Sequence, residues 1–579
     1  MNIKISKKIF LFSILTIVFF LIGLYSQISY GLPFFQNGDE NAFLKSTLYF
    51  FGFFTHANQN LIDPITTPLL NFLISGFLSF IYNLSFINLP LSDFQNFIYL
   101  NPDKFFLFSR ISSLIVSSLS LFVIFLILKK LKINQIFFNL SFFSIAASPI
   151  FLDIGIVAGK NAYLLFFYMV QTYFFLKYIN KIEKFSLKSY FIFGILGAIA
   201  WGINYWGALP SIYAVFFLHY QKNGFKKVKY IYLFLSIFFV AGFLPNFILS
   251  ESNILQHLFD SSIIDTDHEK YPNKNRIVIF FQEIYQSIIM IIQTEIPLVI
   301  SVIIMFFLFF FLIKRKIINS NDEIKIIFTF CFFIFEPILL FAVAEWAYPQ
   351  FRYFGPSIVI LNLLFVYLIN FVFENLTSTK TKKILKISFL IIISLTIFLK
   401  LNVHYNFKTT IDKNFNQFRV LDSFENEKTI FMFSNMLLRE NEKMVNIYSR
   451  LQKDRIIIPG KYGDGRNSPK ELQKKSKILA KYKNTNISPN SKNFRFFGSE
   501  FEILDEEKFI KFMIDNFDSI IIEKDFPVIE NILINNKFKR EKISETMNIL
   551  TGRTLLRKIL SKSENNYYIG PEIYIYYLR

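Results

Sequence analysis

Cysteine is almost absent from this chain: of 579 residues, only Cys331 is a cysteine, and it lies within an apolar run. A single cysteine excludes an intrachain disulfide and a cysteine-ligated metal cluster. Charged residues are also scarce, at 18% of the chain, whereas 53% of the residues are apolar and 78 are phenylalanine. This composition predicts a polytopic α-helical membrane protein with room for one extra soluble domain.

Acidic residues are fewer than basic ones, 42 against 62. A basic excess can mark a nucleic-acid-binding protein, but here it gathers in short connections between apolar runs, which is typical of residues that orient membrane spans. No nucleic-acid partner is therefore expected. With the N-terminus inside the cell, every inner connection is basic, namely residues 129–132, 177–188, 222–229, 314–316 and 380–386.

Apolar runs suitable for membrane spans recur along residues 1–401. A span needs roughly 20 mainly apolar residues to cross the hydrocarbon layer. The first run follows three lysines as in a signal peptide, but no convincing cleavage site follows it, so we expect an uncleaved first span. A run of about 30 residues around Tyr205 could be two short spans or one long tilted helix. Taking two, the expected spans number eleven: 9–29, 105–128, 133–151, 162–176, 189–204, 205–219, 230–250, 288–313, 326–344, 353–373 and 385–399.

Two regions outside these spans carry their own predictions. The external loop 30–104 contains an apolar segment, 68–84, with polar stretches on both sides that face the same compartment, so we expect an interfacial helix along the membrane. From residue 402 to 579, charged residues become frequent and short runs rich in β-branched and aromatic residues appear, at Thr429, Arg455, Phe517 and Glu572. These runs predict strands of a small external α/β domain.

Two adjacent carboxylates, Asp39 and Glu40, follow the first span within the stretch Gly38-Asp39-Glu40-Asn41. Acids placed just outside a membrane span are usually there for chemistry or ion handling. Any loop can carry acids, however, so this pair gains weight only from the motifs that follow it.

Four stretches, in this order and on one predicted side of the membrane, resemble membrane-embedded glycosyltransferases of the GT-C type. The most similar are the protein O-mannosyltransferases and the bacterial lipid A aminoarabinose transferases, which use polyprenyl-phosphate-linked sugars. The resemblance covers roughly the first 400 residues. The stretches are "NGDENAF" at 37–43, "DPITTPLLNFL" at 63–73, "FLFSRISSLIVSSLSLFVIFLILKKL" at 106–131 and "QFRYFGPSIVIL" at 350–361.

The resemblance implies an inverting transfer of one sugar from a polyprenyl-phosphate donor to an external lipid, glycan or protein acceptor. Such a transfer needs a carboxylate base for the nucleophile and cations for the leaving phosphate. It implies Asp39 as the base, with Glu40 orienting the site or binding substrate. Arg352 would bind the phosphate or, alternatively, anchor a helix end by snorkelling. The residues expected to bind substrate are Arg352, Tyr353, Lys160, Asp153, Glu345, Arg110 and His56.

The chain departs from the family in two places. Relatives usually carry an acid where this chain has Asn161, so either Asp153 substitutes by geometry or the acceptor-side contact is lost. The family's lysine near the interfacial proline motif is replaced by Thr66 and Thr67. No metal site is predicted, because His56 and the acidic loop around residue 268 lack the spacing of metal ligands. A divalent ion is compatible with the chemistry, but no sequence motif indicates where one would bind.

The predicted location is the bacterial cytoplasmic membrane, with the C-terminal domain on the outer, periplasmic side. An alternative from another class is a transporter or flippase for lipid-linked sugars, which would carry charges along a path through the membrane and related halves. A third is a non-catalytic binder of such lipids, which Asn161 keeps open.

Overall fold

The computed structural model describes most of the first 418 residues and short stretches of the remainder. The described residues are 7–29, 47, 66–91, 93–94, 102–179, 181–245, 276–314, 321–343, 351–418, 429–432, 444–446, 494–497, 500–503, 519–523, 531, 533–544, 547–548, 568–569 and 573–577.

Helices account for almost all of the described residues up to 418, and a helix lies within each of the eleven predicted apolar segments. The described α-helices are α1 (Lys7–Tyr25), α3 (Thr66–Tyr82), α5 (Pro102–Lys130), α6 (Gln135–Ala146), α7 (Pro149–Gly155), α8 (Lys160–Ile179), α9 (Leu187–Trp201), α10 (Leu209–Asn223), α11 (Lys229–Phe238), α15 (Arg276–Lys314), α16 (Asn321–Val343), α17 (Gly355–Asn375) and α18 (Thr379–Phe418).

Shorter turns extend or join these helices. They are the π-helices η1 (Asn83–Ile87) and η4 (Phe239–Phe243) and the 3₁₀ turns η2 (Ile182–Lys184), η3 (Tyr205–Ala208) and η6 (Phe351–Phe354).

The chain is an α-helical membrane protein. Six of the described helices are long and apolar enough to cross a membrane alone, and a seventh span results if the bent pair α6 and α7 is counted as one. The first helix and those at 187–201, 229–243 and 277–289 are apolar but shorter. The number of eleven spans therefore stays a prediction.

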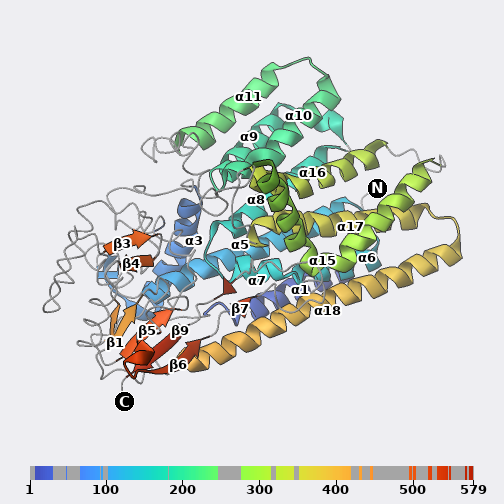
Figure 1. The fold of residues 1–579 in the computed structure, drawn as a ribbon. Coiled ribbons are helices and arrows are strands. Elements are labelled where there is room, and N and C mark those ends of the chain that lie inside the picture. The colour runs from blue at the N-terminus through green and yellow to red at the C-terminus, as the bar shows by residue number, and fades with distance from the viewer. Residues whose placement is uncertain are drawn as a thin grey trace.

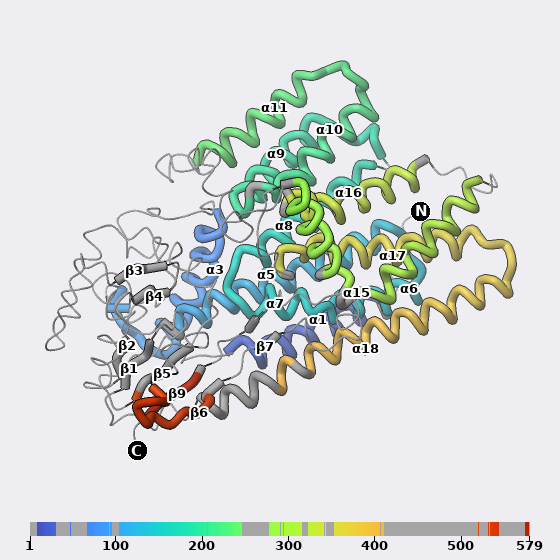
Figure 2. Tube along the Cα trace, viewed as in Figure 1, coloured from blue at the N-terminus to red at the C-terminus, as the bar shows by residue number. Residues whose placement is uncertain are grey.

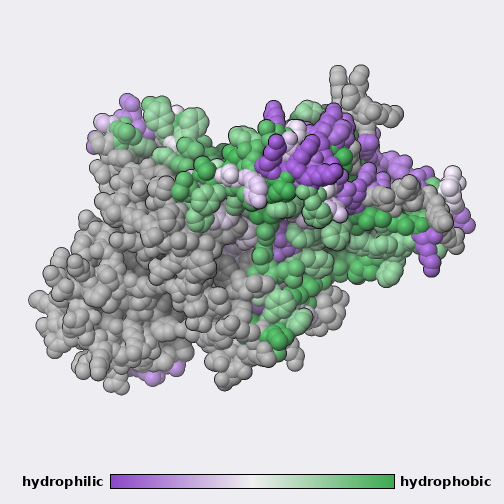
Figure 3. Space-filling view, turned by 90° about the horizontal axis from the view of Figure 1, so that it is seen from above, coloured by the Kyte–Doolittle hydropathy of each residue, from purple (hydrophilic) through white to green (hydrophobic). Residues whose placement is uncertain are grey.

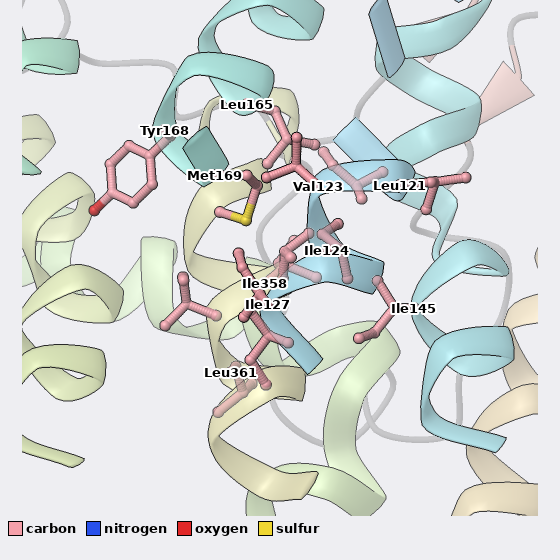
Figure 4. Packing of buried hydrophobic residues seen from close by; sticks show 14 of the residues in the cluster. Leu121, Val123, Ile124, Ile127, Ile145, Leu165, Tyr168, Met169, Ile358 and Leu361 are labelled. Atoms are coloured by element: carbon pink, nitrogen blue, oxygen red, sulfur yellow. The ribbon is translucent and has the colours of Figure 1, made fainter. Parts of the chain in front are cut away.

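Helix α17 lies at the centre of the bundle. In its most apolar window 89% of the residues are buried, against 28% in α18, where large apolar side chains such as Ile391 and Phe398 are exposed. Figure 4 shows side chains of α5, α6, α8 and α17 packed together around Ile124 and Ile358. In Figure 3 hydrophobic side chains cover much of the coloured surface, and many of the hydrophilic ones gather in one group at the upper right. Such an apolar outer surface suits contact with lipid.

Two helices are broken by proline. Helix α7 begins at Pro149 and is bent by 44° from α6. Helix α15 has non-helical backbone angles at Glu295, two residues before Pro297. Proline lacks the N–H that would continue the hydrogen-bond ladder and its ring clashes with the preceding turn, which explains both bends.

The apolar run around Tyr205 forms two helices. Helix α9 ends at Trp201, and η3 leads into α10. The side chain of Gln171 satisfies the backbone at this turn, with Nε2 donating to the Gly207 carbonyl at 3.0 Å and Oε1 accepting from Ser211 N at 2.9 Å. The alternative of one continuous tilted helix is therefore wrong.

Helix α3 occupies the segment predicted as an interfacial helix. It stands across the direction of α5, α17 and α18, at the end of the bundle nearest the strands (Figure 1). That orientation agrees with a helix lying along the membrane, although α3 with η1 is also long and apolar enough to span it. The interfacial assignment stays a prediction.

Basic residues from separate connections meet at the other end of the bundle. The ammonium group of Lys130, at the end of α5, lies close enough to Lys177, Lys181 and Lys184 to be repelled by them. Lys222, at the end of α10, donates to the carbonyls of Glu183 and Phe185. The ends of α5, α8 and α10 thus lie together, as the predicted alternation of basic inner connections requires.

Helix α18 leads from the bundle toward a five-stranded mixed sheet, and β6 packs against it (Figure 2). The strand order is β2-β1-β5-β9-β6; β1 pairs in parallel with β2 and β5, and β9 is antiparallel to β5 and β6. Three predicted strand runs, at Thr429, Phe517 and Glu572, contribute β1, β5 and β9, while the run at Arg455 lies outside the described residues. The strands are β1 (Thr429–Met432), β2 (Met444–Asn446), β5 (Ser519–Glu523), β6 (Lys539–Ser544) and β9 (Ile573–Tyr577), with the paired strands β3 (Phe494–Phe497) and β4 (Glu500–Ile503), and β7 (Met547–Asn548) and β8 (Tyr568–Ile569).

Candidate functional site

Several of the predicted site residues lie at the end of the bundle opposite the lysine connections. Asp153 is on α7, and Arg352 and Tyr353 are on η6, which packs directly against α7. All three side chains are buried, with exposed fractions of 1%, 6% and 8%. The Arg352 guanidinium carbon is 5.6 Å from the centre of the Tyr353 ring. An acid and an arginine are therefore carried on neighbouring segments, inside the protein, at the start of the central helix.

The start of α8 adjoins the same region. Lys160 is its first residue and is partly exposed, and the preceding Gly159 N donates to Ser113 Oγ of α5 at 3.4 Å. Asn161 is 8% exposed, and its Oδ1 has no hydrogen-bond partner among the residues that the structure describes. A buried amide oxygen without a donor is costly, so this position is suited to accept a hydrogen bond from a bound molecule.

Arg110 occupies a different environment from the one expected of a substrate ligand. It is 1% exposed on α5, and its Nη1 donates to the backbone carbonyl of Ile28 at 3.0 Å. Ile28 lies in the turn that follows α1, so the guanidinium clamps the end of the first helix to α5. This contact is a structural one, and substrate binding by Arg110 stays a prediction.

A buried polar network links α3, α5 and α8, and sequence reasoning missed it. Tyr163 shares a hydrogen bond of 2.5 Å with Ser112 and donates to Asn71 Oδ1 at 3.3 Å. Asn71 Nδ2 donates to Thr47 Oγ1 at 3.1 Å and to Ser109 Oγ at 3.2 Å. The available signal was the polar residue Asn71 inside the apolar segment 68–84, since a buried polar side chain in such a segment needs partners.

Four of the predicted site residues lie outside the described part of the chain: Asp39, Glu40, His56 and Glu345. Two described residues that precede and follow the Asp39 motif, Ile28 and Thr47, are hydrogen-bonded to the bundle. Ile28 is bound by Arg110, and Thr47 by Asn71 of α3. Both flanks of the loop therefore lie on the α3–α5 side of the bundle, at the end where α5 begins.

A second feature that sequence reasoning missed is a fully buried ion pair. Lys400 Nζ of α18 is 2.9 Å from Glu295 Oε1 of α15, and both side chains have zero exposure. Lys400 also donates to Ser144 O at 3.0 Å, to Ser144 Oγ at 3.3 Å and to Asn362 Oδ1 at 3.2 Å. The signal was an acid within one apolar run and a lysine at the end of another, because charges inside membrane segments need partners.

Glu336, which lies within the α16 apolar run, is a further buried acid. Tyr168 Oη lies 2.8 Å from Glu336 Oε2 and 3.2 Å from the Phe333 carbonyl oxygen, so its single proton can be donated to either. The tyrosine hydroxyl therefore supplies a partner for this carboxyl group between α8 and α16.

No three His, Cys, Asp or Glu side chains gather as a metal site would need within the described ranges. In comparisons with known proteins, no family model matches the chain and no curated protein sequence matches it. The resemblance to GT-C glycosyltransferases thus depends on the four sequence motifs alone.

Proposed function

We propose that this protein is an inverting glycosyltransferase that moves one sugar from a polyprenyl-phosphate donor to an external lipid, glycan or protein acceptor. The observation that carries the proposal is the packing of α7, with Asp153, against η6, with Arg352 and Tyr353. Both segments lie at the end of the bundle opposite the basic connections, which is the outer end under the positive-inside rule.

In the proposed reaction, a hydroxyl oxygen of the acceptor attacks the anomeric carbon as the bond from that carbon to the phosphate oxygen breaks. The electron pair of that bond leaves with the polyprenyl phosphate, and the hydroxyl proton passes to the Asp39 carboxylate. Attack from the face opposite the leaving phosphate inverts the anomeric centre. Because the phosphate leaves as an anion, one base and a nearby cation suffice, and a second carboxylic acid is not needed.

Arg352 is the proposed ligand of the donor phosphate. A guanidinium group presents a planar pair of donors that match two phosphate oxygens, and burial strengthens such charge-assisted bonds. Its place at the start of α17 puts it at the predicted headgroup depth, while the lipid tail would lie between helices. Lys160, on α8, would provide the second positive charge at this end.

Asn161 would bind the sugar or the acceptor. Its buried Oδ1 has no donor among the described side chains and backbone groups, so a substrate hydroxyl could satisfy it. This assignment replaces the acidic contact of the family with a neutral one. Asp153 would act beside it, and Glu345 and His56 are further proposed substrate ligands.

The remaining parts of the proposal concern topology. The protein would cross the bacterial cytoplasmic membrane eleven times with its N-terminus inside. Residues 402–579 would form an external, periplasmic α/β domain that covers the site or receives the acceptor. The five-stranded mixed sheet supports an α/β fold for that region.

Substitution Asp39→Asn tests the proposal. Purified protein in lipid nanodiscs should lose transfer, measured by mass spectrometry of the acceptor, while binding of polyprenyl phosphate persists. Arg352→Met should instead weaken polyprenyl phosphate binding by about tenfold or more, and Arg352→Lys by less, because lysine keeps the charge without the planar pair of donors. Lys325→Met, at a partly exposed lysine of α16, serves as the charge-matched control.

The acceptor and sugar can be identified by comparing lipids and glycans from cells with and without the protein.

Undiminished transfer by the Asp39→Asn variant would refute the assignment of the base. Unchanged binding of polyprenyl phosphate by the Arg352→Met variant would refute the assignment of the phosphate ligand.

A transporter or flippase for lipid-linked sugars is the second candidate. The observation that favours it is the presence of buried charges within the spans, namely the pair Glu295 and Lys400 and the separate Glu336. Such charges mark transport paths in many membrane proteins. A flippase would move labelled lipid across liposome membranes and would be insensitive to Asp39→Asn, whereas the glycosyltransferase would fail to move it.

A further inference from the structure

The break between α6 and α7 leaves two backbone carbonyls without their usual donors. In a continuous helix, the amide of Ser148 would bond to Ser144 O and that of Phe151 to Ala147 O. Here Ser148 N donates to Ile145 O and Phe151 N to Ser148 O, both at 3.0 Å. A carbonyl left unbonded inside a membrane bundle is costly, so both groups need other donors.

Helix α18 supplies both donors from side chains one turn apart. Lys400 Nζ donates to Ser144 O at 3.0 Å, and His404 Nε2 lies 3.1 Å from Ala147 O. The carbonyl can only accept, so His404 carries its proton on Nε2 in this contact. Lys400 and His404 thus cap the end of α6 from a helix more than 250 residues further along the chain.

The charge of Lys400 is balanced within the same cluster. Glu295 pairs with it at 2.9 Å and sits where α15 bends, and Asn362 Oδ1 of α17 accepts from it at 3.2 Å. The cluster therefore joins α6, α15, α17 and α18. A buried pair of this kind is strongly destabilised when one partner alone is removed, because the other charge stays buried.

The cluster lies beside the segments that carry the candidate site. Helix α7 starts at Pro149, two residues after Ala147, and packs against η6. A Cβ added at Gly355, which follows η6, would come within 3.2 Å of Ile150 Cγ1, so α7 and the start of α17 are in close contact. A shift of α7 would consequently move the start of α17.

We propose that Lys400 and His404 of α18, with Glu295 as counter-charge, are positioning residues that hold α7 and η6 in place and thereby set the site of the proposed glycosyl transfer. The effect on glycosyl transfer rests on the proposed function, whereas the statement that Lys400 and His404 hold α7 and η6 in place does not. Helix α18 also packs against β6 of the C-terminal sheet. Lys400 and His404 therefore connect the helix that contacts this sheet to the segments that carry Asp153 and Arg352.

Hydrogen–deuterium exchange of the substrate-free protein in nanodiscs tests the inference. The variant His404→Phe should raise amide exchange in residues 144–155 and 351–362 by about tenfold or more, since one buried carbonyl loses its donor. His404→Gln keeps an N–H donor and should restore most of the protection. Residues 187–223, in α9 and α10, should exchange as in the unchanged protein.

Lys400 gives a second, independent arm. Lys400→Met should raise exchange in residues 144–155 and also around the α15 bend, by on the order of a hundredfold, because it removes a donor and strands the Glu295 charge. The double variant Glu295→Gln with Lys400→Met should restore protection at the bend but leave 144–155 raised. Lys325→Met, at a partly exposed lysine outside the cluster, is the control and should change neither.

Two results would overturn the inference: equal exchange of 144–155 in His404→Phe and the unchanged protein, or a His404→Gln variant no better than His404→Phe. The measurement involves no substrate. Absence of transfer by the unchanged protein would therefore refute the proposed function and leave the positioning result intact, while an unchanged exchange pattern would refute only the positioning.

Discussion

Gly207 occupies a place in the turn between α9 and α10 that has no room for a side chain. A Cβ there would lie 2.6 Å from the Ala200 carbonyl oxygen and 2.8 Å from Leu164 Cδ1. Backbone cannot yield as a flexible side chain can, so the two helix ends can approach each other and α8 only with glycine at this position. The apolar run predicted two short helices, with one long helix as the alternative, and this contact explains why the turn between them carries glycine.

Gly207→Ala should consequently destabilise the protein by about 1–3 kcal/mol, as overpacking of a filled site does. The matched control is Gly159→Ala, whose added Cβ would meet no atom within 4 Å. Thermal unfolding in detergent, followed by tryptophan fluorescence, should show a lower midpoint for Gly207→Ala only. Equal midpoints for the two variants would contradict this account of the turn.

At the scale of elements, α3 is joined to the bundle by the side chains of Asn71 and Tyr163. Most of its outer surface is exposed, with Leu73 and Phe77 more than half exposed. Apolar side chains on that surface suit lipid and give little hold on the bundle. The hydrogen bonds that Asn71 makes with Tyr163 of α8 and Ser109 of α5 therefore contribute to the attachment of α3, and the bond from Tyr163 to Ser112 holds the tyrosine in place.

Tyr163→Phe should weaken that attachment by about 1–2 kcal/mol, because Asn71 and Ser112 then lose a buried partner. Exchange of backbone amides in residues 66–82 should rise by about tenfold while α17 keeps its protection. Tyr220→Phe is the control, because Tyr220 is 56% exposed. An unchanged exchange rate in α3 would mean that other contacts hold it.

The elements themselves were largely predictable, and their contacts were not. Long apolar runs such as 105–128 and 353–373 predict α5 and α17 because a membrane requires helices of that length. The pairing of Glu295 with Lys400 could not be predicted, since it joins residues of separate helices more than 100 positions apart. Apolar periodicity indicates that a helix exists but not which helix lies beside it.

At the scale of the whole molecule, the alternation of basic connections predicts that one end of the helix bundle is rich in lysine and arginine and the other is not. The mutual repulsion of Lys130 with Lys177, Lys181 and Lys184 shows that one set of cations lies at one end. Asp153, Arg352 and Tyr353 lie on neighbouring segments, α7 and η6, away from that end. The sequence predicted that the segments carrying Asp153 and Arg352 lie on the same side of the membrane. The hydrogen bond from Arg110 to Ile28 could not be predicted, because it depends on how the helices pack. The roles of Asp39, Glu40, His56 and Glu345 stay predictions.

The most direct test is to locate the donor phosphate on the protein. A polyprenyl phosphate with a photoreactive group beside the phosphate can be cross-linked in nanodiscs, and the modified peptides identified by mass spectrometry. The account predicts adducts within residues 149–165 and 351–362, and their loss in Arg352→Met but not in Lys325→Met. Adducts confined to the lysine connections at 129–132 and 177–188, equally strong in the Arg352→Met variant, would contradict it.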